Sequence, residues 1–210
     1  DMANNGTVEL NATGAAANEV IVLVKDAATN NTDVLNVVLN VANDVNNGTL
    51  TVANVETIKI TATDSTPVNT NTGAATINTS DFILAATSAK TVTITGNAHL
   101  DLDMTGNTAA TLIDASTMTG DLTVTAYNAG MTVKGGAGAD DITIAATADG
   151  SKFYGNAGND KFIIAAGADL ITIDGGAGKD TFDFNGVSTN KSNFVVLNNV
   201  DSGDTLDLVA

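Results

Sequence analysis

Short runs of alternating apolar and polar residues recur every twenty residues in the second half of the chain. Alternation with a period of two is typical of a β-strand with one buried face. One apolar row at this spacing contains Leu102, Leu122, Ile142, Phe162 and Phe182, and the next contains Met104, Val124, Ile144, Ile164 and Phe184. A third row, on the opposite strand, contains Ile113, Val133, Phe153 and Ile173. Such a repeat predicts stacked coils, so we expect an all-β, right-handed parallel β-solenoid.

A turn rich in glycine and aspartate precedes three of these strands at the same interval: GGAGAD at 135–140, GNAGND at 155–160 and GGAGKD at 175–180. Stacked turns would place their aspartates in one column, about 4.8 Å apart. At an effective dielectric constant of about 20, Coulomb's law gives roughly 3 kcal/mol of repulsion per adjacent pair of carboxylates. A cation between the turns would remove this repulsion. Because glycine turns also expose carbonyl oxygens, the candidate is calcium, a hard cation that prefers oxygen ligands.

Glycine opens and closes these turns, and we expect it there because glycine adopts a positive φ without steric cost. Asn156 replaces the second glycine of the middle copy, and asparagine also tolerates left-handed geometry. The opening glycines are Gly135, Gly155 and Gly175, and the closing ones are Gly138, Gly158 and Gly178.

The three turns and the apolar residues after them resemble the GGxGxDxU calcium-binding repeat of RTX (repeats-in-toxin) proteins. This resemblance implies that the solenoid ends in a calcium-binding β-roll, with one site between each pair of consecutive turns. It also implies ligands from main-chain carbonyls and from the aspartates on both sides, so Asp160 would serve two ions. The ligand residues that it implies are Gly135, Gly136, Ala137, Gly138, Asp140, Gly155, Asn156, Ala157, Gly158, Asp160, Gly175, Gly176, Ala177, Gly178 and Asp180.

Aspartates outside the three turns are weaker candidates. The opposite corners, AATADG and AAGADL, have lost most of their glycines, so we expect Asp149 and Asp169 to be solvated turn residues. Together with Asp183 they are also candidate extra ligands at contacts between molecules. For Asp201 and Asp204, in VDSGD, two interpretations stay open: a further cation site, or ordinary turn residues.

Strand signals continue upstream with a weaker period, at 20–25, 34–41, 50–52 and 57–62, and they return at 194–197 and 205–208. The stretch 63–73 carries the only proline and is the expected boundary or long corner. We therefore expect an N-terminal β-rich segment at 1–65, a β-solenoid at 66–134, the RTX β-roll at 135–184 and C-terminal flanking strands at 185–210.

The chain has 210 residues and a formal net charge of −16, with eight lysines and neither arginine nor cysteine. An acidic surface argues against nucleic acid and anionic lipid as partners, and it suits a protein that holds divalent cations. Disulfide and thiolate chemistry are excluded. The first ten residues show no basic and apolar export signal, and no apolar run approaches the length of a membrane span.

Two phrases, VANVETIKITATD at 52–64 and IDASTMTGDLTVTA at 113–126, resemble RTX-type surface-layer proteins of Gram-negative bacteria. This resemblance implies type I secretion and calcium-dependent self-assembly into a lattice on the cell surface. The implied partners are copies of the same protein and, through a region outside this sequence, outer-membrane lipopolysaccharide. The alternatives are a calcium-stabilised region of a large RTX adhesin and the non-catalytic RTX tail of an exported enzyme. In each case we expect the chain to be part of a larger protein.

An enzymatic role finds no support in the residues. His99 is the only histidine, and no nucleophile or metal-ligand pair accompanies it. We expect it to be an outward-facing polar side chain. Asp101 and Asp103 follow at alternate positions and should form a solvated face opposite the apolar residues of HLDLDM. No catalytic residue and no organic cofactor is therefore predicted, and the expected metal is Ca2+.

Overall fold

The computed structural model describes residues 2–10, 19–25, 27, 29, 32–41, 44–65, 78–184 and 194–208. This part of the chain forms 18 strands and no helix, which confirms the all-β prediction. Every pair of neighbouring strands is parallel. Without helices, the described residues also contain no long apolar helix that could cross a membrane.

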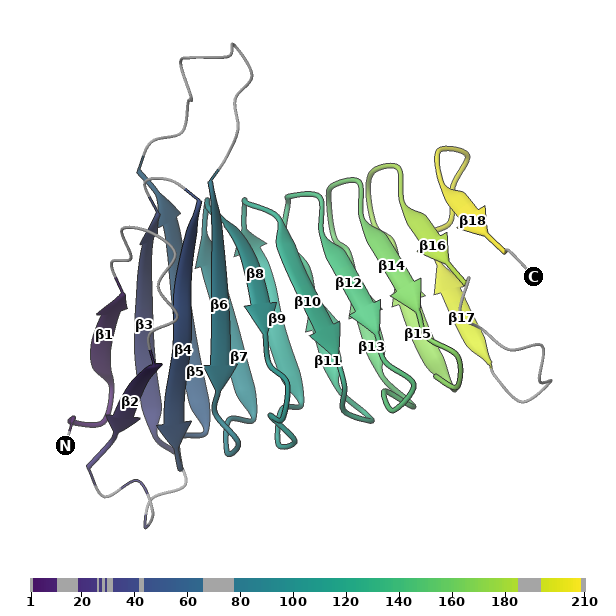
Figure 1. Cartoon of the computed structure of the whole chain (residues 1–210). Coiled ribbons are helices and arrows are strands. Elements are labelled where there is room, and N and C mark those ends of the chain that lie inside the picture. Colours follow the sequence, from purple (N-terminus) through teal and green to yellow (C-terminus); the bar gives the residue numbers. More distant parts are fainter. Residues whose placement is uncertain are drawn as a thin grey trace.

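Two nine-stranded sheets face each other, and the chain changes sheet after each strand (Figure 1). One sheet contains β1 (Gly6–Leu10), β3 (Val34–Val41), β5 (Thr57–Asp64), β7 (Thr91–Gly96), β9 (Leu112–Met118), β11 (Thr132–Lys134), β13 (Lys152–Tyr154), β15 (Ile171–Asp174) and β17 (Val195–Asn198). The other contains β2 (Glu19–Leu23), β4 (Val45–Ala53), β6 (Thr79–Ala85), β8 (His99–Asp103), β10 (Leu122–Ala126), β12 (Asp141–Ile144), β14 (Lys161–Ile164), β16 (Thr181–Asp183) and β18 (Thr205–Asp207). This is the arrangement of a parallel β-solenoid with sheets that do not close on each other. Its right-handed path stays a prediction.

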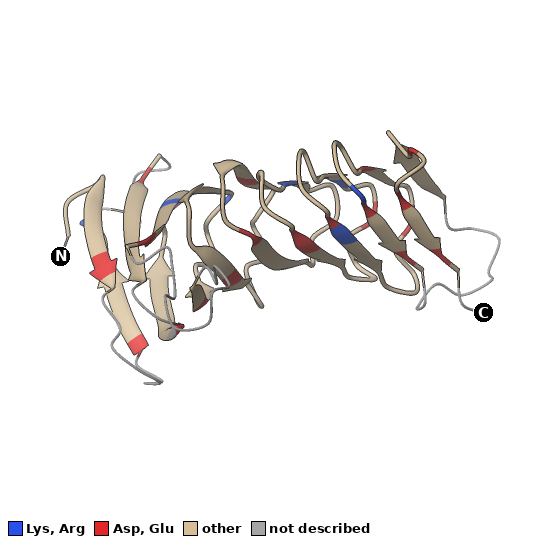
Figure 2. Ribbon diagram, turned by 90° about the horizontal axis from the view of Figure 1, so that it is seen from above, with Lys and Arg blue, Asp and Glu red and all other residues tan. Residues whose placement is uncertain are grey.

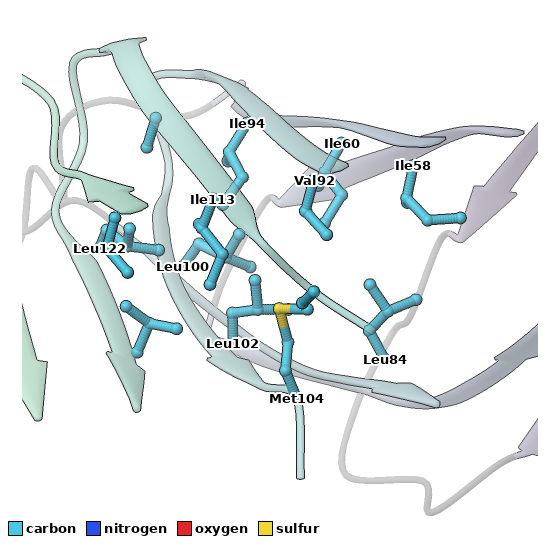
Figure 3. Packing of buried hydrophobic residues seen from close by; sticks show 14 of the residues in the cluster. Ile58, Ile60, Leu84, Val92, Ile94, Leu100, Leu102, Met104, Ile113 and Leu122 are labelled. Carbon is cyan, nitrogen blue, oxygen red and sulfur yellow. The ribbon is translucent and has the colours of Figure 1, made fainter. Parts of the chain in front are cut away.

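The apolar core fills the space between the sheets (Figure 3). The predicted row on the first sheet is confirmed, because its residues pair in register from β9 to β15 and each is at most 1% exposed. On the second sheet, Phe162 and Phe182 stack with ring centroids 5.6 Å apart. Burial of one such side chain stabilises a protein by about 1.5–3 kcal/mol, so these rows hold successive coils together.

Both predicted rows on the second sheet are wrong at β10. Leu122 pairs with Leu100 and not with Leu102, whereas Val124 pairs with both Leu102 and Ile142. The step from Leu100 to Leu122 is 22 residues and the step from Val124 to Ile142 is 18. A slip of two residues leaves every apolar side chain facing inward, so alternation alone cannot detect it.

Strand length changes along the solenoid in a way that positions the glycine turns. β3 and β5 have eight residues each, whereas β11 to β16 have three or four. In the later coils most residues therefore lie in turns, and the glycine turns connect an odd-numbered strand to the next even-numbered one. The expected boundary at 63–73 lies mostly within 66–77, outside the described residues, and the four-segment division stays a prediction.

Candidate metal centre

Asp140, Asp160 and Asp180 end the three glycine turns, directly before β12, β14 and β16, and each is only 1% exposed. The parallel pairing of these strands stacks the three residues. Oδ1 of Asp160 accepts the N–H of Asp140 at 2.8 Å, and Oδ1 of Asp180 accepts the N–H of Asp160 at 3.0 Å. The fold thus brings the predicted aspartates together as one buried column.

The hydrogen bonding of the second carboxylate oxygen, Oδ2, differs among the three aspartates of this column. Oδ2 of Asp140 accepts the N–H of Gly136 at 2.6 Å. The Oδ2 atoms of Asp160 and Asp180 are buried and have no hydrogen-bond partner. A buried polar group without a partner costs about 1–3 kcal/mol, and a charged one costs more. A positively charged ligand at these two oxygens would offset that cost.

The Oδ2 atom of each column aspartate adjoins the first glycine of its own turn. A Cβ added to Gly155 would overlap both Oδ2 of Asp160 and the carbonyl oxygen of Gly175 in the following turn. A Cβ added to Gly135 would overlap Oδ2 of Asp140 and lie 2.8 Å from the carbonyl oxygen of Gly155. A carboxylate oxygen and a carbonyl oxygen therefore converge on one point in each of two gaps, one between the first and second glycine turns and one between the second and third. Two acceptors cannot bond to each other, so this arrangement suits a cation.

This geometry corrects the predicted reason for the first glycine. The φ angle is not positive at any of the three opening glycines, nor at Gly138. Glycine is needed at the opening position because a side chain would fill the point where the oxygens converge. The left-handed residues of the turns are Asn156 (φ 71°), Gly158 (136°), Gly176 (95°) and Gly178 (153°).

Burial strongly affects the acidity of the aspartate column. It raises the pKa of Asp140 from 3.8 to about 6 and the pKa of Asp160 from 3.8 to about 7. The carboxylates of Asp140 and Asp180 add to the rise at Asp160. The ion pairs found among the described residues, Lys134 with Asp114 and His99 with Asp121, do not include a column carboxylate. A bound cation would therefore supply a counter-charge that these pairs do not.

The chemistry of the donors indicates which cation fits. Carboxylate and carbonyl oxygens are hard ligands that suit calcium, whereas zinc sites in proteins are built mainly from sulfur and nitrogen. No group of three or more His, Cys, Asp or Glu side chains that could hold a metal is gathered in the described part of the chain. The two gaps instead combine carboxylates with carbonyls of Gly155 and Gly175. The carbonyls of Gly136, Asn156 and Ala177 accept hydrogen bonds from neighbouring turns.

The weaker candidate ligands lie away from the column. Asp149 and Asp169 occupy the opposite corner of their coils, where Oδ1 of Asp149 accepts the N–H of Asp169 at 2.8 Å. Oδ1 of Asp169 accepts the N–H of Leu170, also at 2.8 Å. These contacts fit the expected role as turn residues. Asp183 lies within β16 and is partly exposed. Asp204, by contrast, lies at the end of the column, where its Oδ1 accepts the N–H of Asp180 at 2.9 Å.

At the other end of the column, Oδ1 of Asp140 accepts the N–H of Leu122 at 2.7 Å, and the preceding residue, Asp121, was missed by the sequence reasoning. Its Oδ2 is 2.7 Å from Nδ1 of His99, and its Oδ1 accepts the N–H of Ala139 at 2.7 Å. The available signal is the Gly-Asp pair before the apolar run LTV. This Gly-Asp pair lies 18 residues before the corresponding residues of the first glycine turn, so a repeat with a period of twenty residues does not include it. Asp101 and Asp103 are exposed on β8, as predicted.

No protein-family model matches this chain, and no curated protein matches it. The likeness to RTX and surface-layer proteins therefore depends on the motif residues themselves.

Proposed function

We propose that this chain is a non-catalytic, calcium-binding structural component of a secreted bacterial surface layer, which folds and self-assembles when it binds calcium. The observation that carries the proposal is the buried aspartate column. The free Oδ2 of Asp160 lies beside the carbonyl oxygen of Gly175, and Oδ2 of Asp180 is also buried without a partner. Neither ion pair of the described residues neutralises the column. A hard divalent cation satisfies both the charge and the oxygen ligands.

Calcium binding at this position would be coupled to folding. The ligands come from turns that are twenty residues apart and meet only when the coils stack. A ligand that binds only the folded state stabilises it by about 2.7 kcal/mol per site at a hundredfold excess over its dissociation constant. Two sites would contribute roughly 5 kcal/mol, which is comparable to the whole stability of a marginal domain.

Further strands can add at the two ends of the described solenoid. β1 and β2 at one end, and β17 and β18 at the other, each have one hydrogen-bonded neighbour (Figure 1). Large apolar side chains are exposed on or beside these strands: Ile21, Leu23, Phe194, Val196, Leu206 and Leu208. Open strand edges with apolar side chains suit the addition of a strand, either from another copy or from adjoining coils of a larger protein.

The charge distribution explains why assembly would need calcium. Acidic residues are spread along the solenoid, whereas lysines are few (Figure 2). A chain with a net charge of −16 repels its own copies until bound cations reduce that charge. The same charge disfavours nucleic acid as a partner.

The proposal is tested by titrating the calcium-free chain with calcium. Far-UV circular dichroism follows folding, and light scattering with negative-stain electron microscopy follows assembly. We expect folding at low calcium, ordered multimers at millimolar calcium, and reversal by chelator, with magnesium as the control ion. Calcium-dependent folding without multimers would favour the adhesin alternative. A fold and melting temperature that do not respond to calcium would refute the calcium-binding function.

A further inference from the structure

Asp204 repeats the main-chain contacts of the aspartate column one coil beyond the last glycine turn. Its Oδ1 accepts the N–H of Asp180 at 2.9 Å, just as Oδ1 of Asp180 accepts the N–H of Asp160 at 3.0 Å. The carbonyl oxygen of Asp180 accepts the N–H of Thr205 at 2.7 Å, the distance also found one coil earlier. The segment 200–204 lacks the glycine motif but adds a fourth rung to the column.

A free buried oxygen faces this fourth rung. Oδ2 of Asp180 has no hydrogen-bond partner, and the residue is 1% exposed. A Cβ added to Gly175 would overlap this oxygen, as a Cβ added to Gly155 would overlap Oδ2 of Asp160. In the gap between the second and third glycine turns, the corresponding position beside Gly155 also adjoins the carbonyl oxygen of the following turn. Asp174 pairs with Asn198, so the residue that stacks on Gly175 is Asn199, directly before the segment 200–204.

The surroundings of Gly175 differ from those of Gly155, the corresponding residue one coil earlier. The three atoms nearest to the Cβ position of Gly175 belong to Asp180 and Phe182, and none is a carbonyl oxygen of the following coil. Asp204 and Asp201 are close enough that, after burial, their charges further raise the pKa of Asp180. The third gap therefore holds more negative charge than a carbonyl-lined gap would.

Gly203 lies opposite the turn 175–180 in this gap. Its Cβ position lies 3.2 Å from Cγ of Lys179, 3.5 Å from Oδ1 of Asp201 and 3.6 Å from the carbonyl oxygen of Gly178. At Gly158 and Gly178 a Cβ would overlap the carbonyl oxygen of the preceding coil. The main chains of the two coils are therefore farther apart at Gly203 than at Gly158 and Gly178, and the side chain of Lys179 lies beside Gly203.

We propose that a third divalent cation binds between the turn 175–180 and the segment 200–204. Asp180 and Asp204 supply carboxylates from both sides, Gly178 supplies a carbonyl oxygen, and Asp201 supplies a third carboxylate. This inference rests on the proposed calcium-binding function, and the same class of hard cation suits the donors. The carboxylates are not gathered into a closed group in the structure, so binding would draw Asp201 towards Asp180. The third ion would fasten β18 to the column.

The number of tightly bound ions tests this inference separately from the proposed function. Calcium is titrated into the full chain by isothermal calorimetry, with a magnesium background to suppress weak surface binding, and the bound ions are counted by native mass spectrometry. We expect three ions. Two ions would overturn the third site and leave the proposed function standing, whereas none would overturn both.

Two variants locate the third ion. Asp204→Asn can still accept the N–H of Asp180 but loses its charge, and it should bind two ions. Asp207→Asn removes the same charge from β18 and should still bind three. Three ions in Asp204→Asn would overturn the assignment. If Asp204→Asn does not fold, Asp201→Asn replaces it, with at least a tenfold loss of affinity at one site expected; unchanged affinity at all three sites would equally overturn the assignment.

Discussion

Replacing Asp160 with asparagine should stabilise the calcium-free protein and, at the same time, weaken the effect of calcium. Asparagine has the size of aspartate, and its Oδ1 can still accept the N–H of Asp140, now accepted at 2.8 Å. Its Nδ2 would take the position of the free Oδ2, beside the carbonyl oxygen of Gly175. Two facing acceptors would then become a donor and an acceptor.

The size of this effect follows from the acidity of Asp160. Burial raises its pKa from 3.8 to about 7, which corresponds to a destabilisation on the order of 4 kcal/mol when the carboxyl is ionised. In a chain of this size, 1 kcal/mol changes the melting temperature by about 2–4 °C. In chelator at pH 8, Asp160→Asn should therefore melt on the order of 10 °C higher than the unaltered protein.

Calcium should reverse this order. Asp160 lies between the two carbonyl-lined gaps, so its replacement should remove most of the roughly 5 kcal/mol that two sites contribute. The assay is thermal melting followed by circular dichroism, with chelator and with saturating calcium. The matched control is Asp44→Asn, because Asp44 is exposed and its Oδ1 accepts the N–H of Thr79, a bond that asparagine can keep. The reasoning is wrong if Asp160→Asn melts lower than the unaltered protein in chelator, or if it keeps the full calcium response.

Three further outcomes are expected. Because burial raises the folded-state pKa of Asp140 to about 6 and of Asp160 to about 7, the calcium-free fold should lose stability as pH rises from about 4 to about 7. Melting scans in chelator should show a smaller loss of stability in Asp160→Asn than in the unaltered protein. Equal slopes of melting temperature against pH in the two proteins would contradict this. Asp140→Asn should raise the midpoint of calcium-induced folding less than Asp160→Asn, since Asp140 borders one gap between glycine turns; circular dichroism titration decides the order. Gly155→Ala should lower the free energy of unfolding by about 1–3 kcal/mol through overlap with oxygen atoms, whereas Gly150→Ala, with open space around it and φ of 70°, should cost about 1 kcal/mol in urea unfolding.

The sequence was a good guide wherever one period governs both strands and turns. From Asp141 onward the paired residues are twenty apart through β16, and the predicted aspartate column is present there. The prediction fails at β10, where a 22-residue step is followed by an 18-residue step. Asp121 was missed for the same reason. The position of Asp204 was left open because the last coil has 24 residues between paired positions, such as Thr181 and Thr205.

The amino-acid sequence alone determined that apolar and polar residues alternate along the strands, that the strands stack in parallel, and that three aspartates share one column. Each of these properties follows from spacing along the sequence. Only the tertiary structure decided which oxygen atoms of that column have partners. Oδ2 of Asp140 accepts an N–H, whereas Oδ2 of Asp160 and of Asp180 do not. The contact of Asp140 lies within one turn: Gly136, which donates the N–H, does not have a left-handed φ, whereas the corresponding residues Asn156 and Gly176 have φ angles of 71° and 95°. This backbone angle has no counterpart in the order of residues, since Gly136 and Gly176 are the same residue type at the same position of the motif and yet differ in φ.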